Sequence, residues 1–288
     1  MATDAPSAHA VGGLKSFLNK GGFWPLLIVV VVYLGLYIAA GWLIGLLDSG
    51  GEKDADLLSS VGAVFFQITA GLVVGSIVLT IFTSWMGWNK EIFGRQQIYR
   101  SWWMWIAPLL VALPILGRVF DIDWGGPAVS VVLFTLASGL LIGYSEELLY
   151  RGVAVKMLRA GGHREFSVAL VSSLLFGMSH GINVFSGQEF KVVGPTMVYT
   201  FAFGVLMYLT MRATGFIVFA MILHALTDPT GFLASGGVDK LPGEGGTSAI
   251  AATVGGVTLV LVVVGIALAF CIRGKVGEPK GGHHTAVA

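Results

Sequence analysis

Charge and cysteine are both scarce in this sequence. Only 11% of its 288 residues are charged, and 17 basic residues nearly balance 16 acidic ones, for a net charge of +1. No charge excess points to nucleic acid or to another strongly charged partner. The single cysteine, Cys271, excludes an internal disulfide and a cysteine cluster for zinc or iron-sulfur.

Several familiar patterns are also missing. The sequence contains no internal repeat of the kind that many transporters show. It has no HExxH motif of a zinc protease and no GxSG-type turn for a serine nucleophile. No connection between apolar segments is long enough to separate two domains. We therefore expect one domain, built without these common catalytic motifs.

Long apolar segments are what the sequence has in abundance. Hydrophobic residues make up 55% of the chain, and the mean hydropathy is +0.83. Because about 20 apolar residues span a bilayer core, we predict an all-α polytopic membrane helix bundle, a multi-pass protein of the cell membrane. About eight transmembrane helices are expected, at residues 23–47, 61–86, 102–120, 127–146, 166–182, 192–211, 215–233 and 249–272.

The boundaries and the topology follow from the polar residues around these segments. Residues 1–22 are predicted to form a polar N-terminal tail, 23–272 a single transmembrane domain, and 273–288 a polar C-terminal tail. The first segment is too long for the apolar part of a signal peptide, so it is expected to be a retained helix. Basic residues occupy alternate connections and both tails, which predicts that both termini are cytoplasmic.

Three groups of polar residues interrupt the apolar segments: SEELLYRG (145–152), FGMSH (176–180) and HALTD (224–228). Ionisable side chains inside a membrane are costly and usually face a cavity or the bundle interior. In each group the key residues are four apart, so they share one face of a helix.

The three groups are expected to meet at one depth in the membrane. At 1.5 Å per residue, Glu146 lies about 20 Å from Arg159 along its helix, and His180 about 24 Å from Arg164. His224 lies about 18 Å from Arg212 by the same rise. If these arginines mark the cytoplasmic edge, the three heights agree within about one helical turn.

The two adjacent glutamates are predicted to differ in role. Glu147 precedes Arg151 by four residues, the favourable order for an ion pair within a helix, and this pair is expected to be architectural. Glu146 points about 100° away and has no basic partner in its own helix. It is therefore a candidate general base, with His180 and His224 as hydrogen-bond partners or metal ligands.

In this order the three motifs resemble those of the CPBP family of intramembrane proteases. That family includes the type II CAAX prenyl endopeptidases and bacterial relatives tied to bacteriocin processing or self-immunity. Its pattern reads EExxxR, FxxxH and HxxxN or HxxxD across an eight-helix membrane core. The sequence has EELLYR, FGMSH and HALTD, and the resemblance covers roughly residues 130–235.

The resemblance implies that Glu146 and His180 activate a water molecule. It gives His224 and Asp228 the task of polarising the scissile carbonyl or stabilising its oxyanion. Many members have Asn where this chain has Asp228, and an ionised Asp repels an oxyanion. Asp228 is therefore expected to be protonated, to orient His224 or to bind a metal. The expected supporting residues are Glu147, Arg151 and Phe176, with Asn183 as a further polar candidate near the outer mouth.

Two mechanisms and three functions stay open on the sequence alone. Glu146 acts as a general base without metal, or Glu146, His180 and His224 hold one divalent metal such as zinc with an open position for water. The favoured function is hydrolysis of a peptide bond in a membrane-associated peptide or protein. The alternatives are a non-catalytic membrane protein that binds peptides or confers immunity, and a proton-coupled transporter of small solutes. The expected partners are that substrate and the lipid bilayer, with no nucleic acid, and the sequence leaves open whether the substrate is prenylated.

Overall fold

A computed structural model describes residues 8–98, 100–186, 188–238 and 248–277 of the chain, and within these ranges every regular element is helical. Eight helical stretches are long and apolar enough to cross a membrane, which confirms the predicted all-α bundle. Residues 1–7 and 278–288 of the predicted tails lie outside the described residues. The spans are Phe23–Gly45, Val61–Met86, Trp102–Asp121, Val129–Ala160, Glu165–Val184, Phe190–Thr214, Ile217–Ser235 and Ala249–Ala269.

The elements follow one another with short connections. In chain order they are α1 (Ala8–Lys20), α2 (Phe23–Gly45), η1 (Glu52–Asp54), η2 (Leu57–Ser59), α3 (Val61–Val64), η3 (Phe65–Thr69), α4 (Ala70–Met86), α5 (Asn89–Phe93), η4 (Trp102–Trp105), α6 (Ile106–Asp121), α7 (Val129–Glu147), η5 (Leu148–Ala154), α8 (Val155–Ala160), α9 (Glu165–Ser179), η6 (His180–Ser186), α10 (Phe190–Thr214), α11 (Ile217–Ser235) and α12 (Ala249–Ala269).

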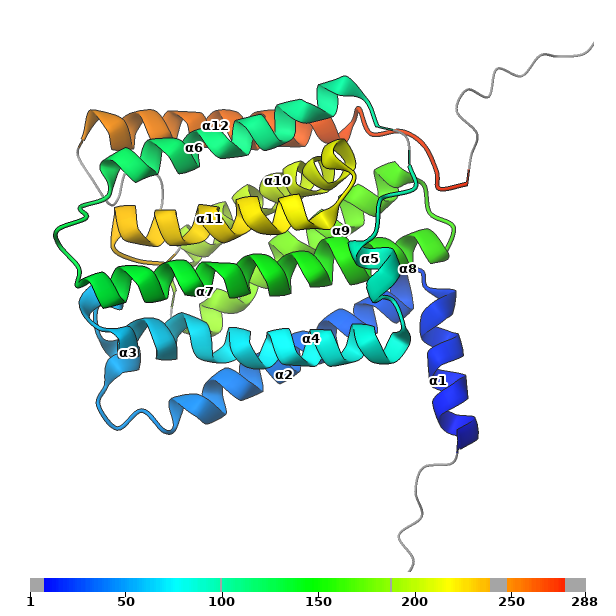
Figure 1. Cartoon of the computed structure of the whole chain (residues 1–288), viewed down its shortest axis with the longest axis horizontal. Coiled ribbons are helices and arrows are strands. Elements are labelled where there is room, and N and C mark those ends of the chain that lie inside the picture. The colour runs from blue at the N-terminus through cyan, green and yellow to red at the C-terminus, as the bar shows by residue number, and fades with distance from the viewer. Residues whose placement is uncertain (1–7, 99, 187, 239–247, 278–288) are drawn as a thin grey trace, which may run out of the picture.

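The spans lie side by side along one axis, with α2 crossing α4 obliquely (Figure 1). Helix α6 packs against α11 and α12, α7 packs against α11, and α10 packs against α9 and α12. Helix α1 lies across one end of the bundle, and the C-terminal segment ends there too (Figure 1). The described ends of the chain are thus on one side, as an even number of spans requires. That this side is cytoplasmic stays a prediction.

A buried ionic cluster joins three helices at the end of the bundle near α1. Glu165 at the start of α9 is fully buried and accepts two hydrogen bonds from Arg159, at 2.9 and 2.8 Å. Tyr208 donates a hydrogen bond to the same carboxylate, and Arg212 lies 3.5 Å from it. The depth estimate from the sequence treated Arg159 and Arg212 as residues that reach the membrane edge. In the structure the side chain of Arg212 is buried within the cluster, beside Glu165 and Tyr208.

The backbones of α7 and α11 approach closely because α7 has glycines where the helices cross. A Cβ atom on Gly139 would lie 2.4 Å from the carbonyl oxygen of Ala225, and one on Gly143 would lie 2.3 Å from that of Met221. Gly139 and Gly143 are four residues apart and so face α11 together. This contact brings the C-terminal end of α7, with both glutamates, against the middle of α11.

The fourth span is continuous from Val129 to Ala160, and α7, η5 and α8 are its successive parts. Its middle part, η5, is π-helical and begins directly after Glu147. Gly125, Gly126 and Pro127 precede this helix and do not interrupt it. The irregular turn instead lies beside the paired glutamates, and π-helical turns are frequent at functional sites.

We expect Gly143→Ala to destabilise the protein by about 1–3 kcal/mol, the usual cost of overpacking a tight contact. The added methyl group would meet the Met221 oxygen and the Ala225 nitrogen, at 2.3 and 2.7 Å, so the two backbones would have to separate. Gly256→Ala in α12 is the matched control, because nothing lies within 4 Å of its Cβ position. Thermal unfolding in detergent measures both variants, and equal midpoints would contradict the close packing of α7 on α11.

Candidate active site

The carboxylate of Glu147 is fully buried and is shared by two helices. Its Oε1 atom lies 3.2 Å from Nη1 of Arg151, one turn further along the chain, so the pair expected from the spacing forms. The same oxygen lies 2.7 Å from Nδ1 of His224 in α11. The hydrogen bond to His224 was not foreseen from the sequence. It fixes the ring of a buried histidine from the neighbouring helix.

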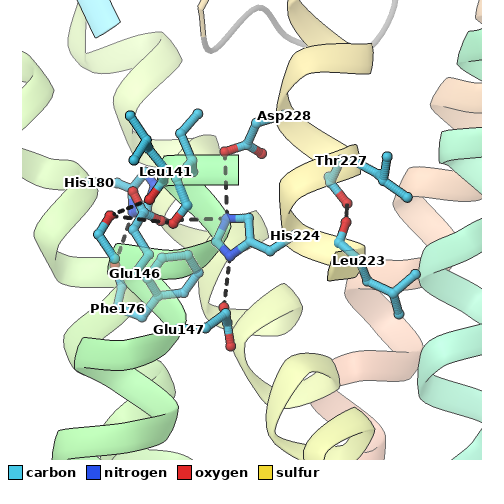
Figure 2. Close-up of polar contacts among 12 residues, drawn as sticks. Leu141, Glu146, Glu147, Phe176, His180, Leu223, His224, Thr227 and Asp228 are labelled. Carbon is cyan, nitrogen blue, oxygen red and sulfur yellow. Dashed lines mark hydrogen bonds and ion pairs between the residues drawn. The ribbon is translucent and has the colours of Figure 1, made fainter. Parts of the chain in front are cut away.

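The other ring nitrogen of His224 faces two carboxylates. Its Nε2 atom lies 3.5 Å from Oε2 of Glu146 and 3.5 Å from Oδ2 of Asp228, which is one turn further along α11. Figure 2 shows the imidazole held between Glu147 on one side and Asp228 with Glu146 on the other. The side chains of Glu146 and Asp228 are 27% and 29% exposed, whereas that of His224 is 2% exposed. The buried histidine therefore directs one nitrogen towards two partly exposed side chains.

These contacts define where the protons of His224 belong. The Glu147 carboxylate is paired with Arg151 and accepts hydrogen bonds, so His224 donates from Nδ1. On the other side, Nε2 without a proton would be a third acceptor beside the oxygens of Glu146 and Asp228. Three acceptors at this spacing need a proton among them, on Nε2 or on one of the carboxylates.

Phe176 is the aromatic centre of the site. Its ring is buried and makes edge contacts with the rings of His180 and His224, at centroid distances of 4.9 and 5.7 Å. The guanidinium carbon of Arg151 lies 4.6 Å from the centroid of the same ring. Nδ1 of His180 donates to the carbonyl oxygen of Phe176, at 3.0 Å. The FxxxH spacing thus lets one residue position the histidine through both its ring and its backbone.

A small cavity of about 90 Å³ adjoins these groups. Glu146 and His180 line it, together with Ser179, Asn183 and Tyr150. Because Nδ1 of His180 is occupied by the Phe176 carbonyl, its Nε2 is the nitrogen free to accept a hydrogen bond in this cavity. The cavity could hold about three water molecules at the volume per molecule of liquid water.

The sequence-predicted residues therefore fall into three sets in the structure, two of which share Glu146. Glu146, His180 and Asn183 line the cavity, and Glu146, His224 and Asp228 meet at Nε2. Glu147, Arg151 and Phe176 form the support behind them. The sequence analysis missed the other wall of the cavity, formed by Tyr33, Leu34 and Tyr37 of α2 and Leu72 of α4. Two tyrosines four residues apart in an apolar helix are the signal that could have found it.

The residues that the sequence offered as metal ligands do not gather as a ligand set. Among the described residues, no three histidine, cysteine or acidic side chains are placed to hold one metal ion. Nδ1 of His224 is bound to Glu147 and Nδ1 of His180 to a carbonyl, which leaves Nε2 as the available nitrogen of each ring.

In this multi-span helical bundle a carboxylate and one histidine line a cavity, and a second histidine lies 3.5 Å from that carboxylate. Residues 128–230 match the family model of the type II CAAX prenyl endopeptidase Rce1-like proteins. This segment includes all three motifs, and the match supports membership of the CPBP family that the motifs resemble. The match covers less than half of the chain, and α2, α4, α6 and α12 lie outside it. A comparison with curated proteins finds no match.

We expect Glu147→Ala to destabilise the protein by about 3–5 kcal/mol, because it leaves the buried charge of Arg151 without its carboxylate. Replacing both residues, Glu147→Leu with Arg151→Met, is expected to recover most of that loss. Glu189→Ala is the control, since the exposed pair of Glu189 with Lys191 contributes at most about 1 kcal/mol. Thermal unfolding in detergent compares the three variants. A double variant as unstable as the single one would show that Arg151 does not depend on Glu147.

Proposed function

We propose that this chain is an intramembrane endopeptidase that hydrolyses a peptide bond of a membrane-associated peptide or protein, with a water molecule activated by Glu146 and His180. The observation that carries the proposal is the cavity beside Glu146 and His180, which lies next to the Nε2 side of His224. The family match supports protease chemistry at the level of the family. The eight apolar spans support an integral membrane protein, and we propose the cell membrane as its location.

In the first step the cavity water loses a proton to Glu146. The carboxylate of Glu146 accepts that proton while the water oxygen forms a bond to the carbonyl carbon of the substrate. Nε2 of His180 accepts a hydrogen bond from the second hydrogen of the water and so fixes its direction. The electron pair of the C=O bond moves to the carbonyl oxygen, which becomes an oxyanion.

In the second step the oxyanion collapses and the peptide bond breaks. His224, with a proton on Nε2, donates a hydrogen bond to the oxyanion, and Glu147 holds the opposite side of the ring. The electron pair returns to re-form the carbonyl group, the C–N bond breaks, and Glu146 gives its proton to the leaving amine. Asp228 stabilises the protonated ring from the side of Nε2.

We expect Glu146→Gln to lower kcat by about 10²–10⁴-fold, the usual contribution of a general base. The test uses the purified protein in liposomes with two internally quenched peptides, one farnesylated at a C-terminal CAAX sequence and one identical but unprenylated. Fluorescence and mass spectrometry follow cleavage and locate the bond. Glu91→Gln is the matched control, because this exposed glutamate pairs with Lys156 far from the cavity.

Three outcomes of this experiment would count against the proposal. Cleavage that survives Glu146→Gln would show that Glu146 is not the general base. A wild-type protein that cleaves neither peptide, yet carries protons with a small solute across the liposome membrane, would favour a transporter. Stoichiometric zinc in the purified protein, with activity lost on chelation, would replace the metal-free scheme by the metal-bound alternative.

We expect Asp228→Asn to retain cleavage within about tenfold and Asp228→Ala to lower kcat by about 10²-fold, the usual effect of losing one group that serves the oxyanion. An Asn amide can donate a hydrogen bond to the oxyanion itself, whereas Ala offers nothing to the oxyanion or to His224. Steady-state kinetics of the two variants on the cleaved peptide measure the difference. Equal activity in Asn and Ala variants would show that residue 228 does not serve the reaction.

A further inference from the structure

One wall of the cavity has no part in the proposed chemistry. It consists of Tyr33, Leu34 and Tyr37 from α2 and Leu72 from α4, which line the same cavity as Glu146 and His180. Neither helix belongs to the segment that matches the family model. This wall is therefore set by a part of the chain that is separate from the three motifs. We refer to these four residues as the aromatic wall.

The tyrosines of the aromatic wall rest directly on the backbone of α4. The sequence GLVVG places Gly71 and Gly75 on one face of that helix. A Cβ atom on Gly71 would lie 3.0 Å from Cε2 of Tyr37, and one on Gly75 would lie 2.6 Å from the hydroxyl oxygen of Tyr33. The two rings are stacked, with centroids 6.3 Å apart. The glycines thus set how far the rings extend towards the cavity.

The chemistry of the two walls differs. The aromatic wall contributes two tyrosines and two leucines. The rest of the lining adds a carboxylate, an imidazole, Ser179 and Asn183 to Leu149, Tyr150 and Ile182. At about 90 Å³ the cavity is much smaller than the roughly 300–1,000 Å³ of a typical ligand pocket. Beside the reacting water it has room for one small apolar group.

We propose that the aromatic wall is a specificity subsite that accepts a small apolar side chain of the substrate peptide beside the bond that is cleaved. The inference rests on the proposed function, because it concerns the peptide that Glu146 and His180 would hydrolyse. Tyr37 is half-buried and Tyr33 is buried, so Tyr37 is the ring that can be changed at the smaller cost in packing. Gly71 is the position whose enlargement would displace that ring, because a Cβ atom there would lie 3.0 Å from it.

The test compares two substitutions with opposite effects on the size of the subsite. Once the cleaved bond is located in the quenched peptide, Ala, Val, Leu and Phe are placed in turn on each side of it. Tyr37→Ala is expected to raise kcat/KM for the Phe peptide relative to the Ala peptide by about tenfold or more, the scale on which an apolar pocket distinguishes side chains. Gly71→Ala is expected to shift the same ratio the other way.

Leu36→Ala is the matched control, because Leu36 lies next to Tyr37 on α2 but is exposed on the outside of the bundle. Tyr37→Leu keeps the contact with α4 largely filled and is expected to shift the ratio in the same direction as Tyr37→Ala. A loss of fold would lower cleavage of every peptide alike and cannot produce opposite shifts. Ratios unchanged in all Tyr37 and Gly71 variants would overturn the subsite while leaving the proposed function intact. A wild-type protein that cleaves no peptide would overturn the proposed function itself.

Discussion

The geometry of the site depends on the carboxylate of Glu147. It is fully buried and is held by Arg151 from its own helix and by His224 from α11. A buried ion pair contributes little net stability, because the loss of hydration offsets most of the attraction. Its effect here is geometric. Because Glu147 accepts the Nδ1 proton of His224, it sets which nitrogen of the ring faces Glu146 and Asp228.

Glycine makes these contacts possible at two places, with different consequences. Gly139 and Gly143 let the backbones of α7 and α11 approach closely enough for a carboxylate on one to reach an imidazole on the other. Gly71 and Gly75 instead let aromatic rings lie against α4. The first pair positions the groups of the proposed chemistry, and the second sets the shape of the space beside them. Apolar side chains give helices no preference for one another over lipid, so close approach through small residues is the available means.

The sequence predicts the eight spans well because lipid imposes the same length and composition on each of them. It also predicts the pairing of Glu147 with Arg151, since residues four apart are neighbours on any helix. It did not predict the bond from Glu147 to His224. That contact depends on how α7 is rotated against α11, which the close packing of Gly143 on Met221 and Ala225 decides. The π-helical turn after Glu147 and the burial of Arg212 also depend on tertiary contacts that no local pattern records.

Glu146 and Glu147 are adjacent and chemically identical, yet their surroundings give them opposite properties. Glu147 has its charge balanced by Arg151, whereas Glu146, Asp228 and His224 form a group with two acids and one base. When both carboxylates are ionised and His224 is protonated on both nitrogens, the group carries one negative charge. One further proton makes it neutral, the state that a low-dielectric interior favours. In the proposed reaction Glu146 takes a proton as the oxyanion forms, so negative charge moves from Glu146 to the substrate and none is created. A step that only relocates charge, between groups already facing one histidine, is one that a membrane interior can accommodate.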